Sequence, residues 1–495
     1  MTYIVKTNRA LQHSSATRHS TNLSNAPREK TINAPISSSY PIAGQKPNNS
    51  WLTSRLIFIA FMIMVPRWYY VENFAFELPF WDQWDAEWAG LLKPWIEGKL
   101  QLSDFFIPHN EHRIFPTRLT TLLLFVITGS WNNLTEARLN IPLSALTPVI
   151  LIGILLKKRV IFGVRWLVVV VIIAGYTLPF SWENILIGFQ SQFYFLNLFT
   201  LCGLALAVYW PEQYMAFLAV IIFCLLSILT SASGLLTSLA VSVVYALGCF
   251  GKQKLSIATC LVIMILILLS FGAYCTMPIV AGHSRLHADN LAEFITAALR
   301  IMGWPLRGSQ LYIGLMWLPT LITIPILIIR RKITKIDLLM TGCFVWTGMQ
   351  IAALAYGRGH ETLHMPSRYS EVLLLGLAGN SWFVLRLPDF FESSHKGRRV
   401  SWLLVTTFFL AILISFIQRT KGDIQTLNQE RTHRITQTSN VSGYLKTRDA
   451  VFLDKQGFAL PYPNPSQLKQ FLDDPLLQKI LIIELDASVK EDVKN

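Results

Sequence analysis

Acidic and basic side chains that could do chemistry are concentrated between residues 77 and 118, in ELPFWDQWDAEWAGLLKPWIEGKLQLSDFFIPHNEHRIFPTR. Asp82 and Asp85 are three residues apart, so on a helix their carboxylates would be neighbours. Two nearby carboxylates repel each other, and one of them then holds its proton more tightly and suits a general base. We expect this pair to be catalytic, with Asp82 as the base of raised pKa. The alternative is that both acids only solvate a helix.

A second polar group in the same stretch is the run PHNEHR. Two histidines three residues apart could in principle bind a divalent cation, but the spacing is not that of zinc enzymes. We therefore expect no cofactor and no bound metal, with a divalent cation as the alternative. The expected substrate-binding residues of this run are His109, Glu111, His112 and Arg113.

Tryptophans recur in this stretch at helical spacing. If residues 80–97 are helical, one face carries Trp81, Trp84, Trp88, Leu91 and Trp95. Tryptophan favours the headgroup layer, so the pattern predicts an interfacial helix lying in the membrane plane.

The composition excludes a soluble protein. The chain has 495 residues, of which 52% are hydrophobic and 15% charged. Repeated apolar runs separated by short basic loops indicate an all-α polytopic membrane protein, because helices satisfy their own backbone in lipid. The formal charge of +14 resides largely in these loops. It follows the positive-inside pattern and does not indicate nucleic-acid binding.

The charges also predict the topology. We expect about eleven spans, with twelve if the short apolar segment 114–131 crosses the membrane instead of being interfacial or re-entrant. The expected spans are about 52–71, 139–156, 163–181, 193–210, 214–230, 235–250, 255–277, 311–329, 336–355, 372–388 and 401–417. Basic loops near 157, 251, 330 and 395 then face the cytoplasm. The N-terminus is cytoplasmic and the C-terminus lies outside.

Three regions follow from this topology. Residues 1–50 form a basic, disordered cytoplasmic tail. Residues 51–417 form the transmembrane domain, with a large first outer loop at 72–138. Residues 418–495 form a small outer α/β domain, with short strands at 449–454 and 479–485 and a helix capped by Asn464 and begun by Pro465. This domain either covers a substrate groove or only packs against the rest of the protein.

The other outer loops carry polar residues that suit binding of a phosphate. Arginine binds phosphate oxygens through charge-assisted hydrogen bonds. No GxxxxGK[ST] or GxGxxG pattern is present, so no nucleotide site is expected and the energy for a reaction must come with the substrate. The expected substrate-binding residues in these loops are Glu183, Gln190, Arg358, His360, Arg368 and Tyr369.

Five sequence features resemble a group of bacterial multi-pass membrane proteins of the GT-C superfamily, whose members are polyprenyl-phosphate-sugar-dependent glycosyltransferases. They are PFWDQWDAEW, PHNEHR, the ENxxxGFQ of 183–190, the SRY of 367–369 and LPYPNPSQL at 460. The resemblance implies that Asp82 or Asp85 acts as base or aligns the acceptor, and that Arg358 and Arg368 meet the donor phosphate.

The same resemblance implies a location in the bacterial inner membrane. The expected partners are membrane lipids, a polyprenyl-phosphate-linked sugar donor and a glycan or lipid acceptor of the cell envelope, such as O-antigen. The WWD-type motif of oligosaccharyltransferases is missing, which argues against a protein acceptor. The alternative function is a transporter or flippase of lipid-linked glycan, but transporters bury ionisable sites within their spans. Here the spans hold few charges, which favours the enzyme.

Overall fold

We analysed a computed structural model of the chain, which describes residues 49–249, 256–306, 310–361, 365–391, 394–455 and 457–482. The expected basic tail and the basic loop at 251–254 lie outside these residues, apart from the last two residues of the tail. Residues Asn49–Asn495 belong to one compact unit. Throughout the described ranges the regular elements are helices, which confirms the all-α fold class.

By length and composition, nine helices in the described part of the chain could cross a membrane. They include or coincide with α1 (Asn49–Phe74), α4 (Asn133–Lys157), α5 (Trp166–Thr177), α7 (Ser191–Tyr209), α9 (Leu235–Cys249), α10 (Ile257–Cys275), α12 (Gln310–Ile329), α13 (Lys335–Gly357) and α15 (His395–Thr447). The protein is therefore embedded in a membrane through several spans.

Two further expected spans are helices of 15 residues each, α8 (Tyr214–Ile228) and α14 (Ser370–Val384). A full crossing takes about 20 residues, so the count of eleven stays a prediction. The segment expected to be interfacial or re-entrant is α3 (Phe115–Thr128), which has 14 residues.

Helix α14 lies at the centre of the bundle, where every one of its residues is buried. It packs against α5, α7, α12 and α13. Gly376 permits the close approach to α13, because a Cβ at this position would lie 2.5 Å from Cγ2 of Thr347. The outward faces of α1, α10 and α12 carry exposed apolar side chains such as Phe61, Phe271 and Ile322, as expected for surfaces that contact lipid.

The tryptophan face of the first loop is largely buried and does not form the expected interfacial surface over its whole length. Residues Trp84–Leu92 form a π-helix that continues into α2 (Lys93–Ile96). Trp84, Trp88 and Leu91 are fully buried. The ring of Trp84 contacts Trp131 edge-on at 5.3 Å and stacks on Phe471 at 6.1 Å. Protein therefore covers the middle of this face, whereas Trp81 and Trp95 at its two ends are 44% and 45% exposed.

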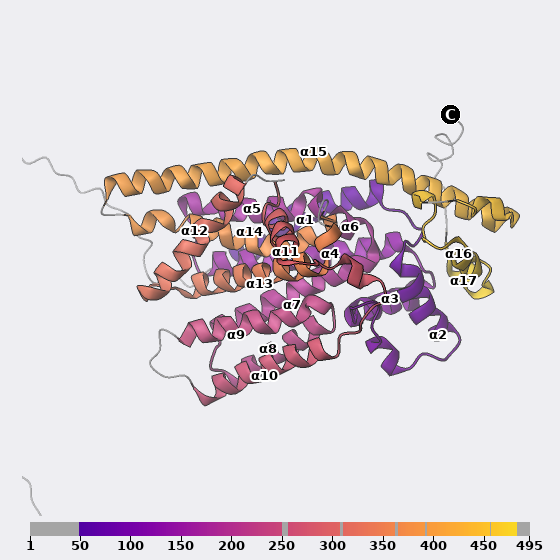
Figure 1. Cartoon of the computed structure of the whole chain (residues 1–495), viewed down its shortest axis with the longest axis horizontal. Helices are drawn as coiled ribbons and strands as arrows, with labels where there is room; N and C mark the ends of the chain where they lie inside the picture. Colours follow the sequence, from indigo (N-terminus) through magenta and orange to yellow (C-terminus); the bar gives the residue numbers. More distant parts are fainter. Residues whose placement is uncertain are drawn as a thin grey trace, which may run out of the picture. The chain divides into compact units, whose positions relative to one another are not determined.

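The covering segment is the C-terminal part of the chain. Helix α15 runs along the bundle for 53 residues and is followed by α16 (Pro465–Leu472) and α17 (Pro475–Ile480). Figure 1 shows α16 and α17 beside α2 and α3. A salt bridge of 2.7 Å between Lys93 Nζ and Asp474 Oδ2 joins α2 to the start of α17.

The expected α/β character of this C-terminal part is wrong for its described residues. The side chain of Asp449 accepts a hydrogen bond from the Val451 amide, and Ala450–Phe452 form a 3₁₀ turn instead of a strand. The second expected strand begins inside α17, and its last residues, 483–485, lie outside the described chain. The helix start is confirmed: Asn464 caps α16, and Pro465 is its first residue.

Candidate functional site

Several segments that are far apart in sequence meet at one end of the bundle. Side chains come from the first loop (72–138), the turn before α7, the residues after α13 and the segment before α16. Residues 109–112 form a tight turn in which the His109 amide lies 2.7 Å from the His112 carbonyl and the reverse bond is 3.0 Å. The turn brings both imidazoles to the site.

The backbone around this site is strained. Three non-glycine residues of the first loop, Trp81, Asn110 and Ile114, have φ values of 49°, 51° and 46°. Asparagine tolerates this left-handed region, whereas a β-branched residue such as isoleucine rarely adopts it. Such conformations persist only where the surroundings enforce them, and they cluster at functional sites.

The side chain of Asp82 is 47% exposed. Its Oδ1 lies 3.6 Å from His109 Nε2. Burial raises the pKa of Asp82, but His109 and the charges of Arg368 and His112 outweigh burial and hold the pKa below its usual value. Asp82 is therefore ionised at neutral pH.

Asp85 is held by the C-terminal segment. The Tyr462 hydroxyl lies 3.0 Å from each carboxylate oxygen, and Gln467 Nε2 lies 3.4 Å from Oδ1. Burial raises the pKa of Asp85, and the charge of Asp82 raises it further. The hydrogen bond from Tyr462 and the charge of His109 lower this pKa by less, so the net result is a raised pKa. The carboxyl of raised pKa is thus Asp85, which corrects the expectation for Asp82.

Tyr462 and Gln467 were not among the site residues expected from the sequence. Both lie in the run LPYPNPSQL, which carries part of the family resemblance, so a signal was present. Nothing in the sequence could show that this run contacts a residue 377 positions earlier.

His112 is half-buried and neutral. Its Nδ1 accepts a hydrogen bond from the Ala232 amide at 3.1 Å, so the proton resides on Nε2, which remains a donor. Burial lowers the pKa of His112 to about 4; Glu111 opposes this shift, while His109 and Arg358 add to it.

Arg368 is anchored before any ligand binds. Its Nη1 lies 2.9 Å from Glu183 Oε1, and its backbone amide donates to Glu183 Oε2 at 2.9 Å. The guanidinium also lies 5.1 Å from the Tyr369 ring centroid. Burial lowers the pKa of Arg368, but Tyr369, Glu183 and Asp82 raise it by more, so its positive charge is secure.

Four expected site residues bind other partners. Arg113 contacts Thr276 at the end of α10, with Nη2 to Oγ1 at 3.1 Å. Gln190 is buried beside Gln192, and Glu111 pairs with His283. His360 faces Asp289 and Glu293 at 3.2 and 3.6 Å. The residues coupled by charge at the site are Asp82, Asp85, His109, Glu111, His112, Arg358 and Arg368.

The ligand atoms of Asp289, Glu293 and His360 lie within 4.8 Å of one another. They suit a divalent cation by type, but Asp289 is largely exposed, and its amide and that of Glu293 take part in local hydrogen bonds at the start of α11 (Leu291–Met302). Among the residues the structure describes, the His109 and His112 pair is not part of a metal-type cluster.

A buried pair of acids, Glu87 and Glu136, lies between the first loop and α4. Gln83 Nε2 lies 3.0 Å from Glu87 Oε2 and 3.2 Å from Glu136 Oε2. Trp131 Nε1 donates to Glu87 Oε2 at 2.9 Å. Burial raises the pKa of Glu87 to about 7, although the hydrogen bonds from Trp131 and Gln83 oppose this. The pair fixes the loop that carries Asp82 and Asp85 onto α4.

A second buried network lies inside the bundle. Arg67 Nη2 is 3.5 Å from Glu371 Oε2, and Nη1 donates to the Tyr194 hydroxyl at 3.0 Å. Ser181 Oγ also donates to Glu371 at 2.6 Å. Sequence analysis missed Arg67, although a lone arginine in an apolar run was a visible signal.

Comparison of the chain with family models, with curated proteins and with solved structures gave no match.

Proposed function

We propose that the protein is a membrane glycosyltransferase. It moves a sugar from a polyprenyl-phosphate donor to a hydroxyl of a cell-envelope glycan or lipid, at the outer face of the bacterial inner membrane. One observation carries the proposal: Asp82, ionised and half exposed, is coupled by charge to His109, His112 and Arg368 at one end of an apolar bundle.

The proposed chemistry assigns Asp82 as the proton acceptor. The acceptor hydroxyl gives its proton to Asp82 as its oxygen bonds to the anomeric carbon. The bond between that carbon and the phosphate oxygen breaks, and the polyprenyl phosphate leaves with the electron pair. Arg358 and Arg368 would stabilise the negative charge on the leaving phosphate.

Asp85 would act as a positioning residue. Its carboxylate is held in place by hydrogen bonds from Tyr462 and Gln467. In this role Asp85 holds the C-terminal segment against the first loop and so fixes the position of the residues that would contact the acceptor.

A lipid-linked donor suits the surroundings. Helix α3 follows the histidine turn directly and carries an exposed apolar stripe of Leu119, Leu123, Val126 and Ile127. These residues share one helical face. A polyprenyl chain could lie along this stripe while its phosphate reaches the arginines.

The test is Asp82→Asn in cells that otherwise lack the protein, with envelope glycans analysed by mass spectrometry. Asparagine keeps the shape and removes the basicity, so transfer should fall by roughly two to four orders of magnitude. Glu97→Gln is the matched control, because Glu97 lies in the same loop and forms an ion pair of 2.7 Å with exposed Lys99. Near wild-type transfer by a well-expressed Asp82→Asn protein would refute the assignment.

A transporter or flippase of lipid-linked glycan is the second candidate, and one observation favours it. The Arg67 and Glu371 pair is buried among spans, and ionisable groups inside membranes often mark transport pathways. Vesicles containing the purified protein and a labelled lipid-linked sugar distinguish the two. A flippase moves the lipid across without forming a new glycoside, whereas the proposed enzyme forms the glycoside only when an acceptor is present.

A further inference from the structure

A cavity lies at the end of the bundle remote from Asp82. The helices α4, α7, α13 and α14 each have one end near the candidate site and the other at this cavity. For example, α7 begins after Gln190 and ends at Tyr209, which lines the cavity. Its 19 residues span about 28 Å at 1.5 Å per residue. The cavity has a volume of about 230 Å³.

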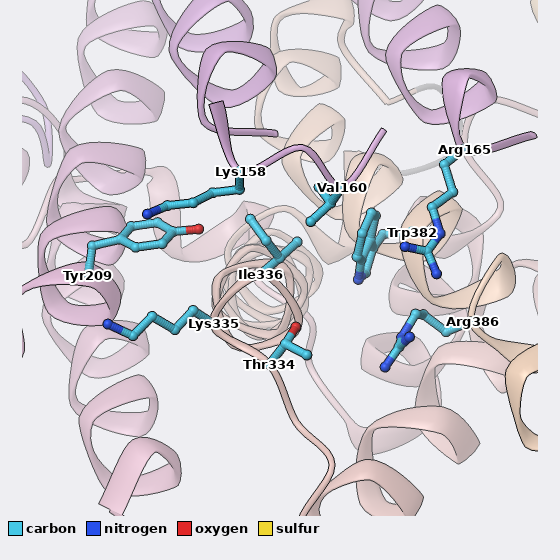
Figure 2. Close-up of a pocket in the computed structure, with 9 residues that line it drawn as sticks. All are labelled: Lys158, Val160, Arg165, Tyr209, Thr334, Lys335, Ile336, Trp382 and Arg386. Atoms are coloured by element: carbon cyan, nitrogen blue, oxygen red, sulfur yellow. The ribbon is translucent and has the colours of Figure 1, made fainter. Parts of the chain in front are cut away.

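Four cations line this cavity: Lys158, Arg165, Lys335 and Arg386. In Figure 2 the two lysines lie on one side, next to Tyr209, and the two arginines lie on the other side, near Trp382. Lys158 and Lys335 belong to two loops that were expected to face the cytoplasm, whereas Arg165 and Arg386 lie near the ends of the expected spans 163–181 and 372–388. Their convergence on one cavity is a property of the fold.

The arginines already have acidic partners. Arg386 Nη1 lies 2.6 Å from Asp389 Oδ2, and its Nε lies 3.3 Å from Asp337 Oδ1. Arg165 Nη2 lies 3.4 Å from Asp389 Oδ2. Arg165 and Arg386 therefore form a neutralised, rigid wall of the cavity.

The lysines differ from the arginines. Lys158 Nζ lies 4.5 Å and Lys335 Nζ 6.0 Å from the centroid of the same Tyr209 ring. Within the described ranges neither lysine forms an ion pair with a carboxylate. Two like charges gathered over one ring repel each other, so an anion between them would stabilise the arrangement.

Tyr209 supplies a second, independent indication of a ligand. Its hydroxyl oxygen is buried, and no described residue forms a hydrogen bond with it. Figure 2 shows this oxygen directed toward the space between Lys158 and Ile336. Buried polar groups normally have a partner, so a bound acceptor in the cavity would satisfy the hydroxyl.

Exposed aromatic residues place the cavity at the level of lipid headgroups. Phe162, Trp166 and Trp210 flank the lining residues in sequence, and all three are exposed. Aromatic residues are enriched at the boundary between membrane and water. Basic pockets between helix ends at this level suit the headgroups of anionic lipids.

We propose that this cavity binds the phosphate of an anionic membrane-lipid headgroup. Lys158 and Lys335 pair with the phosphate oxygens, and the Tyr209 hydroxyl donates a hydrogen bond to one of them. The site is separate from the proposed glycosyltransferase site and does not depend on that function.

The test measures lipid binding to the full-length purified protein by native mass spectrometry. Phosphatidylglycerol is titrated against the wild type and the double variant Lys158→Gln/Lys335→Gln, with phosphatidylcholine as the neutral reference. Each lysine near an anionic headgroup contributes roughly a factor of five in affinity, so the double variant should bind phosphatidylglycerol about 30-fold more weakly. Tyr209→Phe, which keeps both charges, should weaken binding severalfold.

The matched control is Lys157→Gln/Lys332→Gln. It removes two exposed charges from the same two loops, and neither residue lines the cavity. Equal losses in both double variants would overturn the proposal, because binding would then follow surface charge alone. Unchanged thermal unfolding of each variant in detergent shows that it is folded.

A competition experiment with a soluble phosphate compound distinguishes the source of the phosphate. Glycerol 1-phosphate carries the same headgroup chemistry without acyl chains. We expect it to compete only at concentrations far above those of phosphatidylglycerol. If it binds as tightly as the lipid, the cavity is a site for a soluble phosphate compound and the lipid assignment is wrong.

Discussion

The Tyr462 hydroxyl bridges both carboxylate oxygens of Asp85 at 3.0 Å, across 377 residues of chain. This contact links the C-terminal segment to the first loop at the candidate site. It also makes the proton affinity of Asp85 depend on a residue that follows the last span.

Removing this hydroxyl should change the pH dependence of transfer. The hydrogen bond from Tyr462 lowers the pKa of Asp85 against the effect of burial, so Tyr462→Phe should raise that pKa further. If transfer requires ionised Asp85, the acidic limb of the pH profile moves to higher pH. Tyr444→Phe is the control, since it removes a similar bond of 2.6 Å to Asp473 away from the site. Identical acidic limbs in both variants would exclude this coupling.

The buried acid Glu87 should make stability depend on pH. Its folded pKa, about 7, exceeds the model-peptide value of 4.5, so the folded state binds a proton that the unfolded state has released between these values. Stability therefore falls as pH rises from about 4.5 to 7. Glu87→Gln removes the contribution of Glu87 to this dependence and should stabilise the protein at pH 8 by roughly 1–3 kcal/mol, since a tenfold change in proton affinity is worth about 1.4 kcal/mol.

Thermal unfolding in detergent at pH 5 and pH 8 measures this effect. Glu97→Gln is a suitable control, because Glu97 lies in the same loop and forms a surface ion pair with Lys99. A Glu87→Gln protein that is equally destabilised at both pH values would show that the carboxyl is ionised in the folded state throughout.

Lysine should not replace Arg368. The guanidinium contacts Glu183 at 2.9 Å and lies over the Tyr369 ring, and an ammonium cannot provide the same planar fork of donors. We expect Arg368→Lys to reduce donor binding at least tenfold, measured with a labelled polyprenyl-phosphate sugar. Arg113→Lys should have little effect, because Arg113 contacts Thr276. Full donor binding by Arg368→Lys would rule out a role for the guanidinium fork.

Gly188 should not tolerate a side chain. A Cβ at this position would lie 2.2 Å from Cβ and 2.6 Å from Oε2 of Glu136. Gly188→Ala would push the turn before α7 away from α4 and disturb the buried acid pair, so we expect destabilisation by about 1–3 kcal/mol. Gly348→Ala is the control within a helix, because its Cβ would meet no atom within 4 Å. Equal unfolding temperatures for the two variants would contradict this packing.

The predicted orientation can be tested with reporter enzymes fused at Lys332 and at Asp454. The positive-inside rule places the first in the cytoplasm and the second outside. A reporter active only outside the cytoplasm should work at Asp454 and fail at Lys332. The reverse pattern would place the candidate site in the cytoplasm and exclude a donor at the outer face.

The sequence by itself determined the all-α membrane architecture. Apolar runs long enough to cross a bilayer have few other folds available, because the backbone must satisfy its own hydrogen bonds in lipid. The sequence also predicted the start of α16 correctly, because the cap by Asn464 and the helix start at Pro465 depend only on neighbouring atoms of the chain. The charged residues of the first loop could also be selected from the sequence as candidate site residues, because this choice needs only their residue types.

The tertiary structure decided what covers each face and which groups interact through space. Helical spacing identified Trp84 and Trp88 as one apolar face, but the C-terminal segment that buries this face lies hundreds of residues away. The pKa order of Asp82 and Asp85 was predicted incorrectly because it depends on burial, His109 and Tyr462. The pairing of Arg67 with Glu371 likewise joins two spans. Proton affinity and ion pairing are set by distances in space, and a single sequence specifies those only through the complete fold.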